Sequence, residues 1–376
     1  MFFDNASTTK IDDVIIEKLS KFNNEYFYNP GALYADGLKS KNKLEEFRDE
    51  MLSCLQSENG KIIFTGSATE ANNMALFGTL KKNTKKILIS VGEHPSVYNT
   101  ALEIKNRGYD VDFVKLDKTG KVDIEDFKSK MTKDVDFVSI MNVSNETGAI
   151  NDIAKLVSIA KNTNPKVIFH SDGVQSFGKI DVNVDDMGVD LYTISAHKIH
   201  GSKGVGALYI KNGLALKPII FGGGQEGNLR SGTENTIGIF TLVESSKIAT
   251  QNLKKNYEYV LNLKNYFLKK IDESNLNYNL HSFEDNSPYI VSISFLGCRA
   301  ETLLNKLSDY DICVGNGSAC SSKKKNNRVL ENMGLTEKDI ESNLRISFSK
   351  FNTLEEIDYL CEKLILCVND YLDKTR

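Results

Sequence analysis

The chain of 376 residues has no Cys-x-x-Cys pair, although it contains six cysteines. Scattered cysteines without paired spacing do not have the pattern of a disulfide framework. We therefore expect free thiols, and we predict no metal site. The thiols are Cys54, Cys298, Cys313, Cys320, Cys361 and Cys367.

Long apolar runs are also missing, because no stretch approaches the roughly 20 residues that a helix needs to cross a bilayer. The first residues, Met1–Asn5, lack the basic start and apolar stretch of a secretory signal peptide. The net charge of -3 gives no reason to expect binding to nucleic acid or to an anionic membrane. These absences predict a cytoplasmic protein without direct nucleic-acid or membrane partners.

The chain shows no internal repeat, low-complexity tract or long Pro/Ser linker, and it is too long for one small core. Apolar runs that alternate with helical patterns predict βαβ units and a mainly parallel, seven-stranded sheet. The expected helices between strands include Glu70–Leu80, Ser96–Arg107, Ile124–Met131 and Asp152–Asn162. The expected strands are Lys61–Thr65, Lys86–Ser90, Val111–Lys115, Val135–Met141, Val167–His170, Asp190–Ile194 and Gly206–Ile210.

The pattern changes after Lys247, where one long amphipathic helix is expected to run to Ser274. An alternating strand and two further helices follow, which predicts a smaller α+β domain. We expect a large domain over residues 12–250 and a small domain formed by residues 1–11 and 251–376. The later elements are expected at Ile290–Phe295, Glu301–Leu307 and Leu354–Leu372.

Lys198 is the first candidate for chemistry, because it follows the apolar run Val189–Ile194 in Ser195-Ala196-His197-Lys198. A lysine at the end of a buried strand suits the neutral amine that attacks an aldehyde to form a Schiff base. Many strands also end in a solvated lysine, so this lysine alone does not indicate catalysis. The polar clusters that follow other predicted strands support the catalytic interpretation. In open α/β sheets, ligands bind at these carboxyl ends.

The segment after the first predicted strand suits a phosphate. Ser67 and Glu70 have the spacing of a capping box, which predicts a helix start with free N–H groups at Ala68 and Thr69. Such a helix start, preceded by a glycine, can bind a phosphate. An ordinary capped helix would have the same pattern.

Three other strand ends carry polar side chains. His94 precedes a helix that Pro95 can open, and it is either a proton shuttle or a histidine packed in a loop. Asn145 lies in a polar segment that suits ligand contact or a plain turn. Asp172 needs a partner because an isolated buried carboxylate is costly, and either a protonated ring nitrogen or an arginine would serve.

An aldehyde-forming lysine, a carboxylate for a pyridinium nitrogen and a helix start for a phosphate together predict pyridoxal 5'-phosphate as the cofactor. Lys198 would form the Schiff base and later move protons, while Asp172 would keep the ring nitrogen protonated. Gln175 could hydrogen-bond the phenolic oxygen of the ring. The groups expected to hold the phosphate belong to Ala68, Thr69, Ser195 and His197.

Two further segments indicate an amino-acid substrate. Arg345 lies on the alternating segment Leu344–Phe348 and could form a bidentate pair with an α-carboxylate, although a lone strand arginine is usually solvated. Cys320 lies in a segment rich in Gly, Ser and Lys, and the three lysines that follow it favour the nucleophilic thiolate. We expect an exposed loop with a reactive thiol there; an accidental surface thiol is the alternative.

This ordered set of motifs resembles the cysteine desulfurases of the class V aminotransferase family, the branch that supplies sulfur for iron–sulfur clusters. The resemblance implies an aspartate aminotransferase-like fold and a homodimer, with a large cofactor domain and a small domain that carries the catalytic cysteine. It covers nearly the whole chain, through motifs that include Asp4–Thr9, Asn29-Pro30-Gly31, Glu93-His94-Pro95, Asp172-Gly173-Val174-Gln175, Gly317–Cys320 and Leu344–Ser347.

The resemblance also implies roles for single residues. His94 would stack on the cofactor ring and move protons, and Asn145 would lie near the phenolic oxygen. Thr233 would reach the phosphate of the partner subunit's cofactor. Asn29 and Arg345 would bind the carboxylate of L-cysteine.

By the same resemblance, Cys320 would attack the substrate sulfur, keep it as a persulfide for an acceptor protein, and allow L-alanine to leave. The segment Lys323–Arg328 replaces a Pro-Ser sequence that is usual in the family. This difference changes the residues near Cys320 and therefore bears on which protein accepts the sulfur. A selenocysteine lyase or cysteine sulfinate desulfinase would need the same cofactor residues without this thiol. A non-catalytic sulfur-transfer scaffold is disfavoured, because it would need neither Lys198 nor Asp172.

Overall fold

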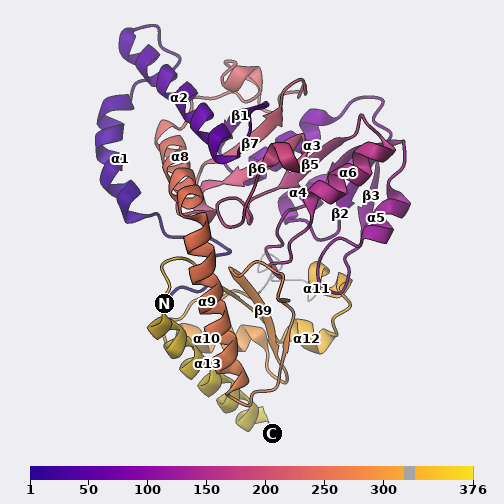
Figure 1. Cartoon of the computed structure of the whole chain (residues 1–376), viewed down its shortest axis with the longest axis vertical. Helices are drawn as coiled ribbons and strands as arrows, with labels where there is room; N and C mark the ends of the chain where they lie inside the picture. Colours follow the sequence, from indigo (N-terminus) through magenta and orange to yellow (C-terminus); the bar gives the residue numbers. More distant parts are fainter. Residues whose placement is uncertain (317–326, 376) are drawn as a thin grey trace.

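The computed structural model describes residues 1–316 and 327–375, and Figure 1 shows a large sheet with its helices above a smaller helical and strand layer. The large sheet has seven strands in the order β1-β7-β6-β5-β4-β2-β3. Strand β7 runs antiparallel to β1 and β6, and the other neighbours are parallel. The predicted seven-stranded, mainly parallel sheet is therefore confirmed. Its strands are β1 (Gly60–Thr65), β2 (Lys86–Ser90), β3 (Asp110–Val114), β4 (Val135–Ser139), β5 (Ile168–Asp172), β6 (Leu191–Ser195) and β7 (Gly206–Lys211).

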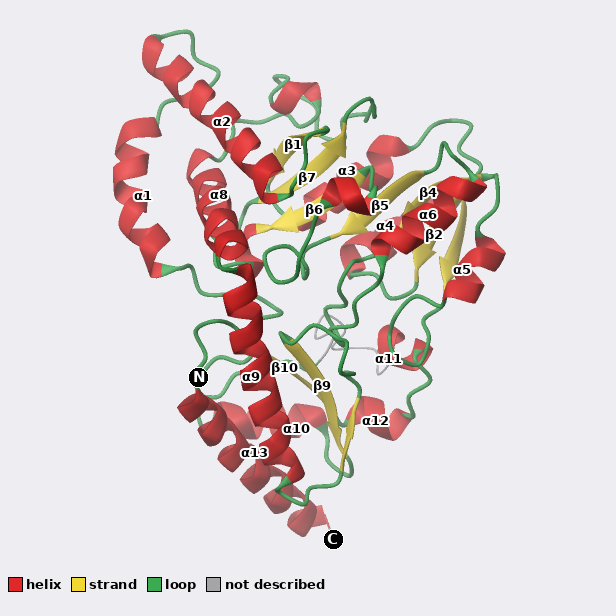
Figure 2. Cartoon of the chain, in the orientation of Figure 1, coloured by secondary structure: helices red, strands yellow, loops and turns green. Residues whose placement is uncertain are grey.

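Helices cover both faces of this sheet, as Figure 2 shows. Along β1, Ile62 and Phe64 belong to one buried apolar cluster, while Ile63 belongs to the cluster on the other face. This alternation explains why the strands read as continuous apolar runs, because a sheet buried on both faces needs apolar side chains in both directions. The helices of this part are α1 (Asp13–Tyr26), α2 (Ala35–Cys54), α3 (Ala68–Thr79), α4 (Pro95–Asn106), α5 (Ile124–Lys130), α6 (Ile153–Thr163), α7 (Val184–Met187) and α8 (Thr236–Gln251).

The smaller layer has its own apolar core around a three-stranded antiparallel sheet in the order β10-β9-β8. No helix of the described part of the chain could cross a membrane. The domain boundary expected after residue 250 stays a prediction. Val329 and Leu330 of α11, and Met333 directly after that helix, pack onto the core of the large sheet. The elements are α9 (Leu253–Asp272), β8 (Tyr278–Leu280), β9 (Ile290–Phe295), α10 (Ala300–Ser308), α11 (Arg328–Asn332), α12 (Glu337–Glu341), β10 (Asn343–Ser347) and α13 (Leu354–Thr375).

The prediction of one helix from Lys247 to Ser274 is wrong. Helix α8 ends at Gln251, and α9 begins at Leu253, so that the two form a broken column beside both layers (Figure 1). The break lies at Asn252, whose backbone leaves helical geometry (φ -106°, ψ 13°) and whose side-chain amide donates to the carbonyl of Ile248 at 2.9 Å. Asparagine side chains that bond nearby backbone groups compete with helix continuation in this way.

The N-terminal arm crosses between the two layers. Phe2 pairs with Cys313 and Asp4 pairs with Ser347 as isolated bridges, and Phe3 is buried in the small core. The arm then reaches the large sheet, where the N–H of Thr9 donates to the carbonyl of His197 at 2.8 Å. Residues 6 and 7, between these anchors, are thereby held over the carboxyl end of β6.

Candidate functional site

A cavity of about 360 Å³ lies at the carboxyl ends of β4, β5 and β6, where α3 and α4 begin. Its position agrees with the rule that parallel strands present their ligands at this edge. Loops and helix starts from both layers line it, including Ala6 and Ser7 of the N-terminal arm. The predicted residues that it brings together are Ala68, Thr69, His94, Asn145, Asp172, Gln175, Ser195, His197, Lys198 and Arg345.

Lys198 ends the short helix η1 (Ala196–Lys198), directly after β6. Its Nζ donates to the carbonyl of Ala6 at 2.7 Å and to the carbonyl of Ser7 at 2.5 Å. Burial lowers the pKa of this ammonium to about 8, and the nearby charge of Arg345 acts in the same direction. A lysine with this pKa has a useful fraction of neutral amine near neutral pH, as nucleophilic attack requires.

Asp172 ends β5 and is 5% exposed. Its Oδ1 accepts the N–H of Val174 at 2.9 Å, and its Oδ2 accepts the side-chain amide of Asn72 at 2.8 Å. Within the described residues, no arginine or lysine forms an ion pair with this carboxylate. Of the two partners expected from the sequence, the arginine is therefore absent from this part of the chain, and the cationic ring nitrogen of a ligand fits.

The start of α3 forms the phosphate side of the cavity. Ser67 caps the helix by accepting the N–H of Glu70 at 3.2 Å, so the first-turn N–H groups of Ala68 and Thr69 lie at the cavity. Glu70 does not complete a capping box, because its carboxylate binds Arg230 at 2.7 Å. Gly206 of β7 lies so close that a Cβ there would be 2.9 Å from the nitrogen of Ala68. This glycine permits the close backbone approach.

His94 caps α4, and Pro95 opens the helix as the sequence predicts. The Nδ1 atom of His94 accepts the N–H of Ser96 at 3.1 Å and lies 2.8 Å from the hydroxyl of Ser96. Burial lowers the pKa of the imidazole, and the positive charges of Lys198 and Arg328 add to that effect against the opposing carboxylate of Asp172. The ring is therefore neutral near neutral pH, which suits proton transfer.

Arg345 projects from β10 into the cavity with its side chain 7% exposed. Its Nη1 donates to the carbonyl of Asn145 at 2.9 Å, and its Nη2 pairs with Asp4 at 2.8 Å. The buried Nε atom has no partner in the described part of the chain. A buried N–H without a partner is costly, so this group is a candidate for binding an anionic ligand.

Some predicted residues lie elsewhere. Asn29 is exposed and accepts the N–H of Gly31 at 2.9 Å within its own turn. Thr233 is exposed and lines a separate cavity of about 100 Å³ with Gly66 and Arg230. Cys320 lies outside the described residues. The roles of these three residues stay predictions.

Several site contacts were missed by the sequence reasoning. Lys179 is buried, and its Nζ donates to Oε1 of Gln175 at 2.8 Å; burial lowers its pKa to about 7. The amide of Gln175 then donates to the carbonyl of Ala6 at 2.8 Å. The spacing of four residues between Gln175 and Lys179 was the available signal, since such pairs face each other on one helical turn. The role of the Ala6 carbonyl could not be predicted from the sequence, because every residue has a backbone carbonyl.

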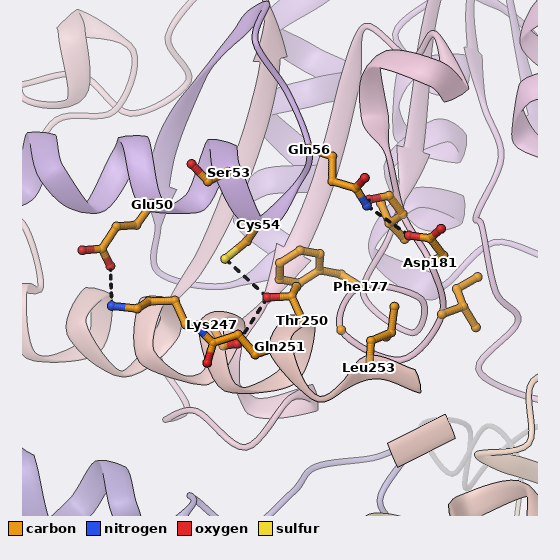
Figure 3. Close-up of a pocket in the computed structure, with 13 residues that line it drawn as sticks. Glu50, Ser53, Cys54, Gln56, Phe177, Asp181, Lys247, Thr250, Gln251 and Leu253 are labelled. Carbon is orange, nitrogen blue, oxygen red and sulfur yellow. Dashed lines mark hydrogen bonds and ion pairs between the residues drawn. The ribbon is translucent and has the colours of Figure 1, made fainter. Parts of the chain in front are cut away.

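A second cavity, of about 540 Å³, lies between the ends of α2 and α8 and contains none of the predicted site residues (Figure 3). Its charged groups are paired with each other, as Lys247 and Glu50 are at 3.0 Å. Burial raises the pKa of the Cys54 thiol, which accepts from the hydroxyl of Thr250 at 3.7 Å. A protonated thiol is a poor nucleophile, so this cavity is not the candidate site.

The donor set of the first cavity fits pyridoxal 5'-phosphate. It offers the amine of Lys198 with a lowered pKa, the buried carboxylate of Asp172 without an ion pair among the described residues, and the start of α3 with its first-turn N–H groups. These groups match the aldehyde, the ring nitrogen and the phosphate of that cofactor. Arg345 adds a site for an anionic group of a substrate.

Comparisons with known proteins agree with this chemistry. A family model described as Aminotransferase class-V matches residues 1–360. The chain is similar to the cysteine desulfurase IscS of Clostridium botulinum (strain Hall), at 36% identity over 371 residues that cover 97% of this chain and 93% of that protein. It is also similar to the cysteine desulfurase IscS 1 of Archaeoglobus fulgidus, at 35% identity over 96% of this chain and 95% of that protein.

Solved structures give the same picture. A NifS-like protein superposes with a TM-score of 0.92 at 32% identity, covering 98% of this chain and 99% of that one. A NifS-like protein from Rickettsia africae superposes with a TM-score of 0.88 at 30% identity, covering 98% and 99%. The similarity extends through both layers of the fold and through every segment that lines the cavity.

Proposed function

The chain belongs to the class V aminotransferase family, and from this membership we propose that it is a pyridoxal-phosphate-dependent cysteine desulfurase. It would convert L-cysteine to L-alanine and keep the sulfur as a persulfide on Cys320. The observation that carries the proposal is the cavity that joins the amine of Lys198, the carboxylate of Asp172 and the guanidinium of Arg345. The names of the similar proteins supply the substrate.

When bound, pyridoxal phosphate supplies an aromatic ring that accepts electron density from the substrate. Lys198 would hold its aldehyde carbon and Asp172 its ring nitrogen. Gln175 and Asn145 would contact the phenolic oxygen. The phosphate would be held by Ala68, Thr69, Ser195 and His197, and by Thr233 of the partner subunit.

The residues of the cavity would then act on the substrate. Arg345 would use its guanidinium to bind the carboxylate of L-cysteine, with Asn29 as the second group proposed for that role. Lys198 and His94 would move protons, since burial keeps both groups neutral at lower pH than usual.

Cys320 would receive the sulfur. Its thiolate would form a sulfur–sulfur bond as the carbon–sulfur bond of the substrate breaks, and the electron pair of the broken bond would stay with the carbon fragment. That fragment would take up a proton and leave as L-alanine. We propose that an acceptor protein in iron–sulfur cluster assembly or in another thiolation pathway then takes the sulfur, in the cytoplasm.

The serine variant of Cys320 tests this proposal. Cys320→Ser should keep the cofactor absorbance and still bind L-cysteine, because the cavity residues are untouched, yet it should release almost no sulfide or alanine. Cys313→Ser is a matched control that should keep normal turnover. Mass spectrometry of the wild type after brief exposure to L-cysteine should find one added sulfur at Cys320. Normal desulfuration by the Cys320→Ser variant would refute the persulfide and favour a direct lyase.

We also propose a homodimer. Large apolar side chains are exposed near the start of α2 and before the Gly-rich turn that precedes Thr233, with Leu33 fully exposed and Phe221 82% exposed. A partner subunit that covers these side chains would remove their apolar surface from water. Thr233 itself is exposed and lies outside the 360 Å³ cavity, which supports its action in the partner subunit.

A further inference from the structure

Asn72 joins two residues of the cavity without lining it. It lies on α3 and is 1% exposed. Its side-chain nitrogen donates to Oδ2 of Asp172 at 2.8 Å and to the hydroxyl oxygen of Ser96 at 2.8 Å. Both N–H bonds of the amide are therefore used, one to Asp172 and one to Ser96. The path of hydrogen bonds runs from Asp172 through Asn72 and Ser96 to His94.

The direction of each hydrogen bond follows from the chemistry of the donors. Because the Ser96 oxygen accepts from Asn72, its own hydrogen is free to point at Nδ1 of His94, 2.8 Å away. The N–H of Ser96 also points at Nδ1, at 3.1 Å. Two donors at Nδ1 require a lone pair there, so the hydrogen of the neutral ring sits on Nε2.

The orientation of the Asn72 amide is decided by its neighbour. Rotating the amide by 180° would place its oxygen against the Asp172 carboxylate, where two acceptors repel each other. In the orientation present, Oδ1 of Asn72 is buried and has no partner among the described residues. A buried oxygen without a donor is costly, and the two hydrogen bonds that the amide nitrogen donates offset this cost.

We propose that Asn72 is a positioning residue that couples Asp172 to His94: it holds the carboxylate in place and directs the Ser96 hydroxyl to Nδ1, where that hydroxyl reinforces the Nε2–H form that the Ser96 N–H already requires. The inference rests on the proposed function only for what Asp172 and His94 do in the reaction. The hydrogen-bonded path itself belongs to the protein without cofactor, so it can be measured there.

The charged groups that face His94 come from three elements: Asp172 from β5, Lys198 from η1 and Arg328 from α11. Glu93, the preceding residue, is also buried. Changing Asn72 removes none of these four side chains. Donors to the lone pair of Nδ1 favour the neutral ring, so weakening them raises the pKa of His94.

The experiment compares Asn72→Leu with Asn73→Leu in the full-length apoenzyme, labelled with ¹⁵N-histidine. Asn73 is the matched control, since it bonds the carbonyl of Thr69 and the hydroxyl of Thr100 but neither Asp172 nor Ser96. The chain has only five histidines, and a His94→Gln variant assigns the signal. The wild type and Asn73→Leu should show a single Nε2–H form. Asn72→Leu should show a raised His94 pKa and affinity for pyridoxal phosphate lower by roughly tenfold.

Ser96→Ala separates the two arms of the coupling. It removes the hydroxyl at His94 but leaves the bond between Asn72 and Asp172, so it should raise the His94 pKa with little change in cofactor affinity. If a folded Asn72→Leu variant keeps the wild-type His94 signal and cofactor affinity, the inference is overturned. Absence of desulfurase activity in the wild type would overturn the proposed function and leave these signals unchanged.

Discussion

At the scale of single residues, burial shifts the pKa of the Lys198 amine and the pKa of the Cys54 thiol in opposite directions. It lowers the pKa of Lys198 to about 8 and raises that of Cys54. In both cases burial disfavours the charged form. For the amine this creates a nucleophile, whereas for the thiol it removes one.

Reduction should locate the cofactor. We predict that borohydride treatment of the holoenzyme removes its visible absorbance and leaves a stable adduct on Lys198, whose Nζ lies at the cavity. Peptide mapping by mass spectrometry checks the position. Lys203, five residues on and exposed, is the internal control and should be unmodified. An adduct on Lys203 would contradict the assignment.

The rate of cofactor attachment should depend on pH through Lys198. Because its pKa is lowered to about 8, the neutral amine is scarce at pH 6.5 and dominant above 8. Reconstitution of the apoenzyme with pyridoxal phosphate, followed by absorbance, should speed up roughly tenfold from pH 6.5 to 7.5 and level off above about pH 8. A rate that keeps rising to pH 10 would show an ordinary lysine pKa.

Asp172 should act through its charge. We predict that Asp172→Ala lowers kcat by about 100-fold or more, because a preorganised charge at the ring nitrogen is lost. Asp172→Glu should keep part of the activity if the carboxylate still reaches the nitrogen. Sulfide release under saturating L-cysteine measures both variants. Unchanged turnover in Asp172→Ala would refute the role.

At the scale of elements, the strands were predictable because each is an apolar run of five or six residues that ends in polar groups. The parallel arrangement then predicted that Asp172 and Lys198 meet at one edge. Helix α2 was not predicted, although its buried residues Leu44, Phe47 and Met51 follow helical spacing. The break between α8 and α9 lies at Asn252, a single residue flanked on both sides by helical patterns.

The site was predictable only where side-chain chemistry marks it. Lysine, aspartate and histidine at strand ends are recognisable, and the structure brings them into one cavity. Asn72 was not recognised, because its proposed role rests on its hydrogen bonds to Ser96 and Asp172, and these contacts exist only in the folded chain. The carbonyl of Ala6, which accepts from Lys198 and Gln175, depends on the path of the N-terminal arm.

His170 provides a prediction about the large sheet. It joins three strands, with Nδ1 at 2.8 Å from the Ser139 hydroxyl and Nε2 at 3.0 Å from the Thr193 hydroxyl. Burial lowers its pKa to about 3, so between pH 6.5 and 3 the unfolded chain binds a proton that the folded chain does not. Stability from this group is therefore lost as the pH falls through that window.

The corresponding test compares the wild type with His170→Asn in urea unfolding. The difference in free energy of unfolding should shrink by about 2 kcal/mol from pH 7.5 to pH 5. Ser139→Ala is the control, since it loses one hydrogen bond but keeps the imidazole and thus the pH dependence. A constant difference between His170→Asn and wild type would mean that His170 is protonated in the fold.

At the scale of the whole molecule, the proposed dimer predicts that sites are shared between subunits. Lys198→Ala and Thr233→Val should each be impaired as homodimers. A purified heterodimer of the two, made with different tags, should recover about half of the wild-type activity, because one site then has both Lys198 and a partner's Thr233. No recovery would place Thr233 in its own subunit's site.

The N-terminal arm links the site to the order in which the chain is made. Residues 2 and 4 pair with residues 313 and 347, and the same arm supplies the carbonyl groups that hold the Lys198 amine. A ribosome has therefore produced all seven strands of the large sheet long before the partners of the arm exist. A nascent chain that has reached α8 contains all seven strands but not the residues that anchor the arm, so we expect covalent capture of the proposed cofactor only in chains that have been translated almost to their last helix.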